Sequence, residues 1–328
     1  MNFAAFQQYR EVPLRERRDI IDCAETNLYR ALSRLIPPPI LPPQSTVHRC
    51  HLASEWVERF GFHPDTSRRA LISCGVRDSL SRLFHYFAGE RATVWIPADN
   101  YPVYGELART AGLTPQEFPT LPEPAWPDAA PANGPELLLI TNPLKPAGRF
   151  LTAEDVKLLV QWLSAGDSRR LLLDAVYTFD TRFHPGTLQL LESGRTLLLH
   201  SLTKGWLHPQ LFGITLVPEA DAGALTPVFR VGPPPQKNLA RARELMNLHA
   251  GMPAAVSQAL ASGMARLHES LPFPVSAPHA PAAPGYFLTV PHPWRELLET
   301  HRILGLPAST FGSRHEDLTI LSSLTFCS

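Results

Sequence analysis

The chain has 328 residues, of which 44% are hydrophobic, and its 30 basic residues are balanced by 30 acidic ones. A chain of this size and composition buries a large core without needing disulfides or metals. The balanced charge argues against a general role at nucleic acids or membrane surfaces, because both attract an excess of basic residues. We therefore expect a small-molecule partner, and neither a nucleic acid nor a membrane.

The cysteines are scattered, at positions 23, 50, 74 and 327, and none forms a CxxC pair. In a chain this large, that pattern is typical of a reducing compartment. The first residues lack the apolar run of a signal peptide, and no later run approaches the roughly 20 residues that span a bilayer. We expect a cytoplasmic protein.

No metal site is expected, because the histidines and cysteine of "HRCH" (48–51) are too close together to bind one zinc ion.

From about residue 66, strand-like and helical segments alternate. Strands are expected at 69–75, 92–97, 136–141, 169–177, 196–201 and 212–218, with helices at 77–89, 103–112 and 152–166. Nearly continuous apolar strands separated by helices are typical of a mostly parallel sheet covered by helices on both faces. The sequence thus predicts a large α/β domain.

Past Pro227 the pattern changes to a long helical stretch at 237–271, followed by a strand at 285–291, a helix at 294–302 and a strand at 317–326. This mixture indicates a smaller α+β domain. We predict an N-terminal arm at 1–40 that contributes to the small domain, a large domain at 41–226 and the small C-terminal domain at 227–328.

Polar motifs follow successive strands of the predicted sheet. In "SCGVRDSL", Gly75 permits a tight turn, and the free N–H groups of Val76 and Arg77 at a helix start can hold a phosphate. In "DNYPVY", Tyr101 and Tyr104 can stack on a flat ligand. Taken alone, each motif is equally compatible with an ordinary strand-to-helix turn or a tyrosine packed in a loop. Their shared place after a strand sets them at one edge of the sheet, where open α/β sheets bind ligands.

Three further motifs follow the later strands. "TNPLKPAG" places Asn142 and Lys145 in a rigid turn. "LLLDAVY" ends an apolar strand with Asp174, and a carboxylate there is costly unless a cation meets it. "LLLHSLTKG" places Lys204 at the end of another apolar strand, where burial disfavours the charged amine. By itself each of these also fits a plain turn, a structural ion pair or a salt-bridged lysine.

The order of these motifs is more specific than any one of them. A phosphate turn, an aromatic residue, N-P-x-x-P-x-G, D-x-x-Y and S-x-x-K resemble the pyridoxal-phosphate enzymes of fold type I. Within these, the chain is similar to the class I/II aminotransferases, the group that includes histidinol-phosphate aminotransferase. The resemblance runs from "IDCAETN" at residue 21 to the C-terminus, and "GYFLTV" and "LGLPASTFG" look like small-domain segments of that group.

The resemblance implies pyridoxal 5′-phosphate as cofactor and a homodimer as assembly. Lys204 would form the Schiff base with the cofactor aldehyde and, once freed, would move the substrate proton. Burial suits this role because desolvation lowers the pKa of a lysine. Asp174 would keep the pyridine nitrogen protonated, and Tyr177 would donate to the ring O3′.

The same resemblance assigns residues to the other contacts of the cofactor and to the substrate. Tyr101 would stack on the ring. The turn at Gly75, with the amides of Val76 and Arg77, would hold the phosphate. The hydroxyl of Ser201 would join it there. Asn27, in "AETN", matches a position on the substrate side.

Some positions depart from the pattern of that group. Where its turn reads N-P-x-N-P-T-G, the second asparagine contacts O3′, and this chain has Lys145 instead. Either Asn142 compensates, or a cation near O3′ changes the electronics of the cofactor. The segment after Lys204 also lacks the arginine that grips the phosphate, which leaves His208 and Gln210 as polar candidates.

The final strand lacks a third familiar residue, the arginine that pairs with the substrate α-carboxylate. Thr319 or an apolar neighbour lies there, and Arg314 in the preceding loop is the nearest substitute. Losing such a pair removes much of the affinity for an α-amino acid. We therefore expect an aminotransferase-like enzyme for an amino compound that lacks a free carboxylate or binds it atypically, such as an amine, an amino alcohol or a carrier-bound or esterified acid.

Two alternatives remain open from the sequence. The same cofactor supports decarboxylation, elimination or oxidation, as in specialised biosynthetic pathways, and the sequence does not show which bond at Cα breaks. The chain is alternatively a non-catalytic relative that uses the fold for binding, which the lost arginine and Lys145 favour. The retention of Lys204, Asp174 and Tyr177 favours an enzyme.

Overall fold

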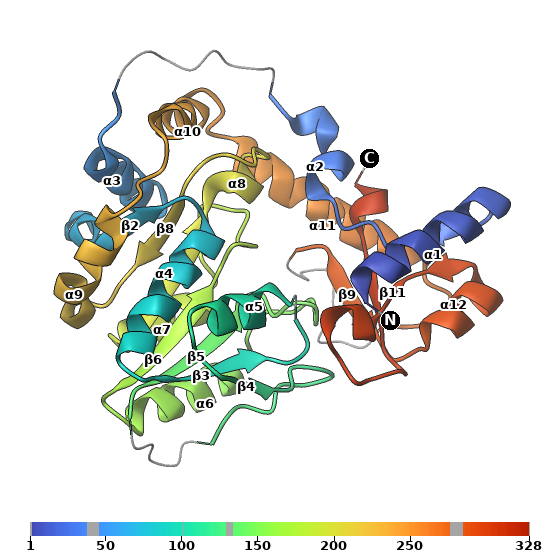
Figure 1. Cartoon of the computed structure of the whole chain (residues 1–328). Coiled ribbons are helices and arrows are strands. Elements are labelled where there is room, and N and C mark those ends of the chain that lie inside the picture. Colours follow the sequence, from blue (N-terminus) through green and yellow to red (C-terminus); the bar gives the residue numbers. More distant parts are fainter. Residues whose placement is uncertain (1, 38–45, 101, 129–133, 276–284, 328) are drawn as a thin grey trace.

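The computed structural model describes residues 2–37, 46–100, 102–128, 134–275 and 285–327 (Figure 1). A seven-stranded sheet with the order β2-β8-β7-β6-β5-β3-β4 forms the centre of the larger part. Its strands are β2 (Ala70–Ser73), β3 (Thr93–Pro97), β4 (Pro115–Phe118), β5 (Glu136–Thr141), β6 (Arg169–Asp174), β7 (Thr196–Ser201) and β8 (Gly213–Leu216). Each predicted strand of this region is present, with ends trimmed by up to three residues.

One strand breaks the parallel pattern. β8 pairs antiparallel with both β2 and β7, whereas the other neighbouring strands of this sheet pair in parallel. Only the single-turn helix α8 (Leu202–Gly205) separates β7 from β8. A parallel connection needs a crossover of a dozen or more residues, so this short link reverses the chain direction. The sheet is therefore mostly parallel, as predicted, with β8 reversed.

Helices cover both faces of this sheet (Figure 1). Leu137 and Leu139 of β5 face one core, and Leu138 and Ile140 face the other, because successive strand residues point to opposite sides. The first core contains side chains of α4, α5 and α9, and the second contains side chains of α3, α6 and α10. The helices of this part are α3 (Arg49–Arg59), α4 (Val76–Gly89), α5 (Val103–Thr110), α6 (Ala153–Ser164), α7 (Pro185–Glu192), α9 (Glu219–Arg230) and α10 (Gln236–Leu248), with the 3-10 helix η2 (Pro64–Arg69).

A second group of elements surrounds a three-stranded antiparallel sheet with the order β11-β12-β9. It comprises β9 (Phe287–Val290), β11 (Leu306–Pro307), β12 (Thr319–Ser322), α11 (Met252–Ser270), α12 (Trp294–His301), η4 (Ala308–Phe311) and η5 (Leu324–Phe326). The N-terminal arm joins this group. It contains α1 (Phe3–Glu16), β1 (Ile21–Asp22), α2 (Leu28–Ala31) and η1 (Ser33–Leu35), and β1 pairs in parallel with β10 (Ile303–Leu304).

Contacts between rings dock α1 on α12, beside which it lies in Figure 1. The Trp294 ring meets Phe6 and Tyr9 edge-on, with centroids 6.0 and 5.1 Å apart. The predicted domain boundary after residue 40 falls outside the described residues. α10, beyond the predicted boundary after residue 226, packs against α3, where Arg59 donates to the Met246 carbonyl at 2.8 Å. The division into domains thus stays a prediction.

Within the described ranges, no helix is long and apolar enough to cross a membrane. The same ranges contain no group of three or more side chains that could hold a metal ion.

Candidate active site

A cavity of about 680 Å³ lies at the carboxyl edge of the large sheet. Segments that follow β2, β3, β5, β6 and β7 form one side of it, and segments of the N-terminal arm, β9 and η4 form the other. The carboxyl ends of parallel strands lie at the same edge, which is where ligands bind in open α/β sheets. This edge brings together residues that are far apart in the sequence.

Lys204 enters the cavity from α8, directly after β7. Ser201 caps this short helix, because its hydroxyl accepts a hydrogen bond from the Thr203 N–H. The Lys204 Nζ lies 5.4 Å from the centroid of the Tyr29 ring and 5.8 Å from that of Tyr177. Burial among these rings lowers its pKa, and the charges of nearby cations lower it further. The amine is therefore more easily neutral, and so more nucleophilic, than a solvated lysine.

Asp174 ends β6 in the cavity wall and is only 3% exposed. Its Oδ2 accepts a hydrogen bond from the Tyr104 hydroxyl at 2.6 Å, and its Oδ1 accepts one from the Val176 N–H at 2.9 Å. Burial raises the pKa of Asp174, while these two donors favour the charged carboxylate. A buried carboxylate with donors on one side can receive a cationic group from the cavity side.

Tyr104 belongs to the first turn of α5 and is itself 8% exposed. Burial, together with the charge of Asp174, raises its pKa well above 10. The phenol therefore keeps its proton and remains a donor to Asp174 at every ordinary pH. The sequence hinted at this residue through the second tyrosine of "YPVY", but not at its bond to Asp174.

Tyr177 connects the two sides of the cavity. Its hydroxyl accepts a hydrogen bond from the Lys145 Nζ at 2.8 Å and lies 3.2 Å from the Tyr286 hydroxyl. Burial alone would raise the pKa of Tyr177, but the charges of Lys145 and Lys204 and the bond from Lys145 lower it to about 8. This phenol is thus unusually acidic, with a lysine on each side.

The other end of the cavity contains the turn before α4. Gly75 adopts φ +138°, a conformation that L side chains rarely take. The N–H groups of Val76 and Arg77 lie in the first helical turn, where they have no acceptor inside the helix. The Arg77 guanidinium makes no hydrogen bond or ion pair with another described residue. These groups form an anion-accepting corner of the cavity.

Ser201 lines the same cavity but is already engaged. Its hydroxyl donates to the Phe212 carbonyl at 3.2 Å, so its one proton points away from an incoming anion. As a phosphate donor it would have to exchange that bond. The phosphate contact of Ser201 stays a prediction.

Two predicted cofactor ligands lie away from the cavity. Asn142 is 1% exposed, and its amide donates to the Thr187 hydroxyl at 2.8 Å and accepts from the Leu151 N–H at 3.1 Å. His208 accepts a hydrogen bond from Arg241 at 3.1 Å on the far side of the turn after Lys204. Neither lines the cavity. Asn142 would have to exchange both of these hydrogen bonds to compensate for the change at Lys145, and that alternative stays a prediction.

The predicted substrate residues also lie elsewhere. Asn27 caps α2, with its side-chain oxygen accepting from the Arg30 N–H at 3.1 Å, and Arg314 is exposed in a loop. Neither is part of the cavity wall. Thr319, where the carboxylate arginine was expected, is buried in β12 and donates to the His292 carbonyl. Tyr101, the predicted ring-stacking residue, lies outside the described residues.

The family model of "aminotransferase class I and II" matches residues 52–284, which is well over half of the chain. The chain belongs to the aminotransferase class I and II family. Its likeness to histidinol-phosphate aminotransferase in particular stays a prediction. A sequence search against curated proteins found no match.

Solved structures of this family share the fold. L,L-diaminopimelate aminotransferase from Chlamydomonas reinhardtii is 17% identical, with a TM-score of 0.69, covering 98% of this chain and 91% of that one. A double mutant of Thermus thermophilus aspartate aminotransferase is 18% identical, with a TM-score of 0.67, covering 99% and 93%. A pyridoxal-phosphate-bound C-S lyase from Staphylococcus hominis is 14% identical, with a TM-score of 0.65, covering 91% and 80%. At these identities the likeness is one of fold.

Pyridoxal 5′-phosphate is the cofactor of this aminotransferase family, and the chain is a transferase that depends on it. The donor set of the cavity fits this cofactor. Lys204 offers an easily deprotonated amine, Asp174 a buried carboxylate, Tyr177 a phenol and the turn before α4 free N–H groups. These groups match the aldehyde, the pyridine nitrogen, O3′ and the phosphate of the cofactor.

The second wall of this aminotransferase cavity was not predicted from the sequence. Its residues lie far from Lys204 in the sequence. They are the aromatic residues Phe3, Tyr29, Tyr286, Phe287 and Phe311, together with Thr26. No charged side chain lines the cavity from this wall among the described residues. The motif "GYFLTV" was assigned to the small domain, and that was the one available signal for Tyr286 and Phe287.

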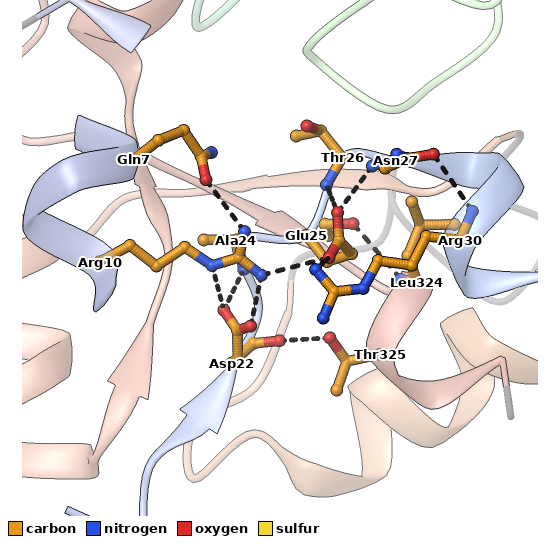
Figure 2. A network of polar contacts seen from close by, with 11 residues as sticks. Gln7, Arg10, Asp22, Ala24, Glu25, Thr26, Asn27, Arg30, Leu324 and Thr325 are labelled. Carbon is orange, nitrogen blue, oxygen red and sulfur yellow. Dashed lines mark hydrogen bonds and ion pairs between the residues drawn. The ribbon is translucent and has the colours of Figure 1, made fainter. Parts of the chain in front are cut away.

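A polar network within the N-terminal arm orders the segment that contributes to this wall, and Figure 2 shows its members. Arg10 makes hydrogen bonds to both carboxylate oxygens of Asp22, and its Nη2 lies 3.4 Å from Glu25. Glu25 in turn accepts the N–H groups of Thr26 and Asn27 at 2.9 and 2.8 Å. This fixes the backbone of Thr26, whose carbonyl accepts from the cavity residue Tyr286 at 3.4 Å.

Proposed function

We propose that this enzyme is an aminotransferase for an amino compound that is not held through a free α-carboxylate in the usual way. The observation that supports it most is one cavity with Lys204, Asp174 and Tyr177 on one wall and no charged side chain on the described part of the opposite wall. The first wall offers what amine chemistry needs. The second offers aromatic surface where an α-amino acid would need a cation.

Lys204 is the proposed catalytic residue. Bound pyridoxal phosphate supplies an electron sink that makes the substrate Cα–H acidic. The Lys204 amine would hold the cofactor at its aldehyde and, once free, would take and return the Cα proton as a neutral base. Its lowered pKa supports this role because a base must be unprotonated when it acts.

Asp174 and Tyr177 are proposed to fix the charge of the ring. The Asp174 carboxylate would hold the pyridine nitrogen and favour its protonated form, and Tyr104, which donates to that carboxylate, favours its charged form and orients it. The Tyr177 hydroxyl would donate to O3′. Tyr101 stays a proposed stacking partner.

The phosphate is proposed to bind at the turn before α4, through the N–H groups of Val76 and Arg77 and the guanidinium of Arg77. The lack of other partners for this guanidinium among the described residues supports the assignment. The segment 205–212 after Lys204 contains no arginine or lysine. Arg77 thus stands in for the missing arginine.

The substrate is proposed to be an amine, an amino alcohol or a carrier-bound or esterified acid with an apolar body. Phe3, Phe287 and Phe311 supply apolar surface to the cavity, and Tyr29 and Tyr286 supply phenols. A free carboxylate against this wall would be desolvated without a bidentate partner. An uncharged group in its place pays no such penalty.

A cytoplasmic homodimer is the proposed state of the protein. The family resemblance supports the dimer, and the four unpaired cysteines support a reducing compartment. Light scattering of the purified chain at micromolar concentration tests the assembly. A monomer across that range would contradict it.

The cofactor test uses the purified full chain. We expect a yellow protein that, after borohydride reduction and digestion, carries the reduced cofactor on Lys204 by mass spectrometry. Lys204→Ala provides the matched control and should lose the label. A colourless chain that binds no added pyridoxal phosphate would overturn the enzymatic proposal in favour of a binding role.

The substrate test compares amines with their α-amino acids in the absence of an acceptor. We expect amines, amino alcohols or esters with aromatic or aliphatic bodies to convert the cofactor to pyridoxamine phosphate, and the free acids to do so at least tenfold more slowly. Efficient turnover of glutamate or aspartate would contradict the proposed substrate class. Release of CO₂, ammonia or peroxide without pyridoxamine phosphate would instead indicate a decarboxylase, lyase or oxidase of a biosynthetic pathway.

A further inference from the structure

Lys145 occupies a fixed place in the cavity wall. It follows β5 in the turn at 142–148, where its N–H donates to the Thr141 hydroxyl at 3.0 Å. Its Nζ lies 2.8 Å from the Tyr177 hydroxyl, 4.5 Å from the centroid of the Tyr177 ring and 5.5 Å from that of Phe287. The ammonium group therefore contacts both walls and is held against one phenol.

A second lysine faces the same phenol. The Lys204 Nζ lies 5.8 Å from the centroid of the Tyr177 ring. Two ammonium groups in one partly buried cavity repel each other, so each disfavours the protonated form of the other. Lys145 has the phenol as hydrogen-bond acceptor, whereas Lys204 packs against the rings of Tyr29 and Tyr177.

We propose that Lys145 is a positioning residue that sets the charge of this site: its ammonium group holds the Tyr177 oxygen and disfavours a second positive charge on Lys204. The directions of the titrations agree with the geometry. Burial raises the pKa of Tyr177, but Lys145 and Lys204 outweigh it and lower it to about 8. Burial lowers the pKa of Lys204, a charged Tyr177 raises it, and the charge of Lys145 lowers it.

Other groups around Tyr177 and Lys204 raise or lower the pKa values of these two residues. The titratable and charged groups that face Tyr177 and Lys204 are Tyr29, Arg77, Tyr104, Lys145, Asp174 and Tyr286. Asp174 favours the charged form of Lys204, and Arg77 disfavours it. A neutral amide in place of Lys145 would leave Tyr177 its phenolic proton and would remove one of the two cations that act against Lys204.

This inference rests on the proposed function only where Lys204 is taken to act in catalysis, because Lys145, Tyr177 and Lys204 interact in the chain without cofactor as well. The first experiment titrates tyrosine absorbance at 295 nm in the full chain freed of cofactor. We expect one tyrosine to titrate near pH 8, and this component should be absent from Tyr177→Phe. In Lys145→Gln the midpoint should move up by at least about one pH unit, because a nearby charge shifts a pKa by that amount or more. Lys145→Arg keeps the charge and should retain the low midpoint.

The second experiment follows the modification of Lys204 by trinitrobenzenesulfonate, which attacks neutral amines, across pH 6–11 with peptide mass spectrometry. The test is run in a Tyr177→Phe background, because the Tyr177 phenolate raises the pKa of Lys204 and would mask the effect of Lys145. In this background Lys145→Gln should raise the midpoint for Lys204, with about tenfold slower modification at pH 7, and Lys145→Arg should behave like Tyr177→Phe alone. Circular dichroism confirms that each variant is folded. An unchanged Tyr177 midpoint in a folded Lys145→Gln, or an unchanged Lys204 midpoint in the folded double variant, would overturn the proposal. Failure of the proposed function would show separately, as a chain that binds no cofactor.

Discussion

Replacing Tyr104 by phenylalanine removes the hydroxyl that donates to Asp174 and leaves the packed ring in place. The two oxygens are 2.6 Å apart, and their residues are 8% and 3% exposed. A hydrogen bond to a buried charged group contributes about 1.5–3 kcal/mol, and without it the carboxylate keeps its desolvation cost. We expect the free energy of unfolding of the cofactor-free chain to fall by about 2 kcal/mol at pH 7.

The loss of unfolding free energy in Tyr104→Phe should be smaller at low pH than at pH 7. Burial raises the pKa of Asp174 in the folded chain above its ordinary 3.8, so this group favours the folded state at low pH, and that contribution is lost as the pH rises through the folded pKa. Removing the Tyr104 hydroxyl raises this pKa further, because it takes away a donor that favours the carboxylate. The destabilisation should therefore shrink toward about 1 kcal/mol, the value of a neutral hydrogen bond, as the pH is lowered to 5.

Urea unfolding followed by circular dichroism at pH 5 and pH 7 measures both quantities. Tyr9→Phe is the matched control, because Tyr9 is 39% exposed and its hydroxyl has no hydrogen-bond partner in the described part of the chain. That variant should change the unfolding free energy by less than about 0.5 kcal/mol. A Tyr104→Phe chain with equal losses at both pH values, or with a loss no larger than that of Tyr9→Phe, would refute the reasoning.

Other predictions concern the phosphate turn and the core. Arg77→Ala should weaken the binding of pyridoxal 5′-phosphate by about tenfold but that of pyridoxal by less than twofold, measured by fluorescence titration, since only the first carries a phosphate; equal losses would exclude a phosphate contact. Glu136→Gln removes the carboxylate that lies 2.6 Å from the buried Arg169 and should cost about 3 kcal/mol in urea unfolding. A loss below about 1 kcal/mol would mean that other contacts satisfy the guanidinium. Gly213→Ala places a Cβ 2.6 Å from the backbone of the turn before α4 and should cost about 2 kcal/mol, whereas Gly223→Ala meets open space and should not destabilise.

The cofactor edge could be predicted because it depends on local pattern. Lys204, Asp174 and Tyr177 each follow an apolar strand, and the ends of adjacent parallel strands meet at one edge whatever the details of packing. The turn at Gly75 was predictable for the same reason, since a glycine between a strand and a helix has few alternatives. The reversal of β8 was also readable in principle, because the link after Lys204 is too short for a crossover.

The remaining contacts depend on long-range packing. The Asn142 amide could have faced the cavity or the core, and Thr187, 45 residues away, holds it on the core side. Likewise, the bond from Tyr104 to Asp174 follows from how α5 lies across the sheet. The aromatic wall required the arm and the last third of the chain to meet, and no local pattern reports such a meeting.

The two ends of the sequence build one wall of the cavity together. Thr325 donates to the Asp22 carbonyl across 303 residues, and Tyr286 reaches Thr26 across 260. During synthesis the strands that present Lys204 and Asp174 emerge well before the partners of the arm. The arm therefore cannot contact these partners until they have been synthesised. Closing so long a loop is an entropically costly, late event. The wall that faces Lys204 is therefore completed only after the last third of the chain has been made.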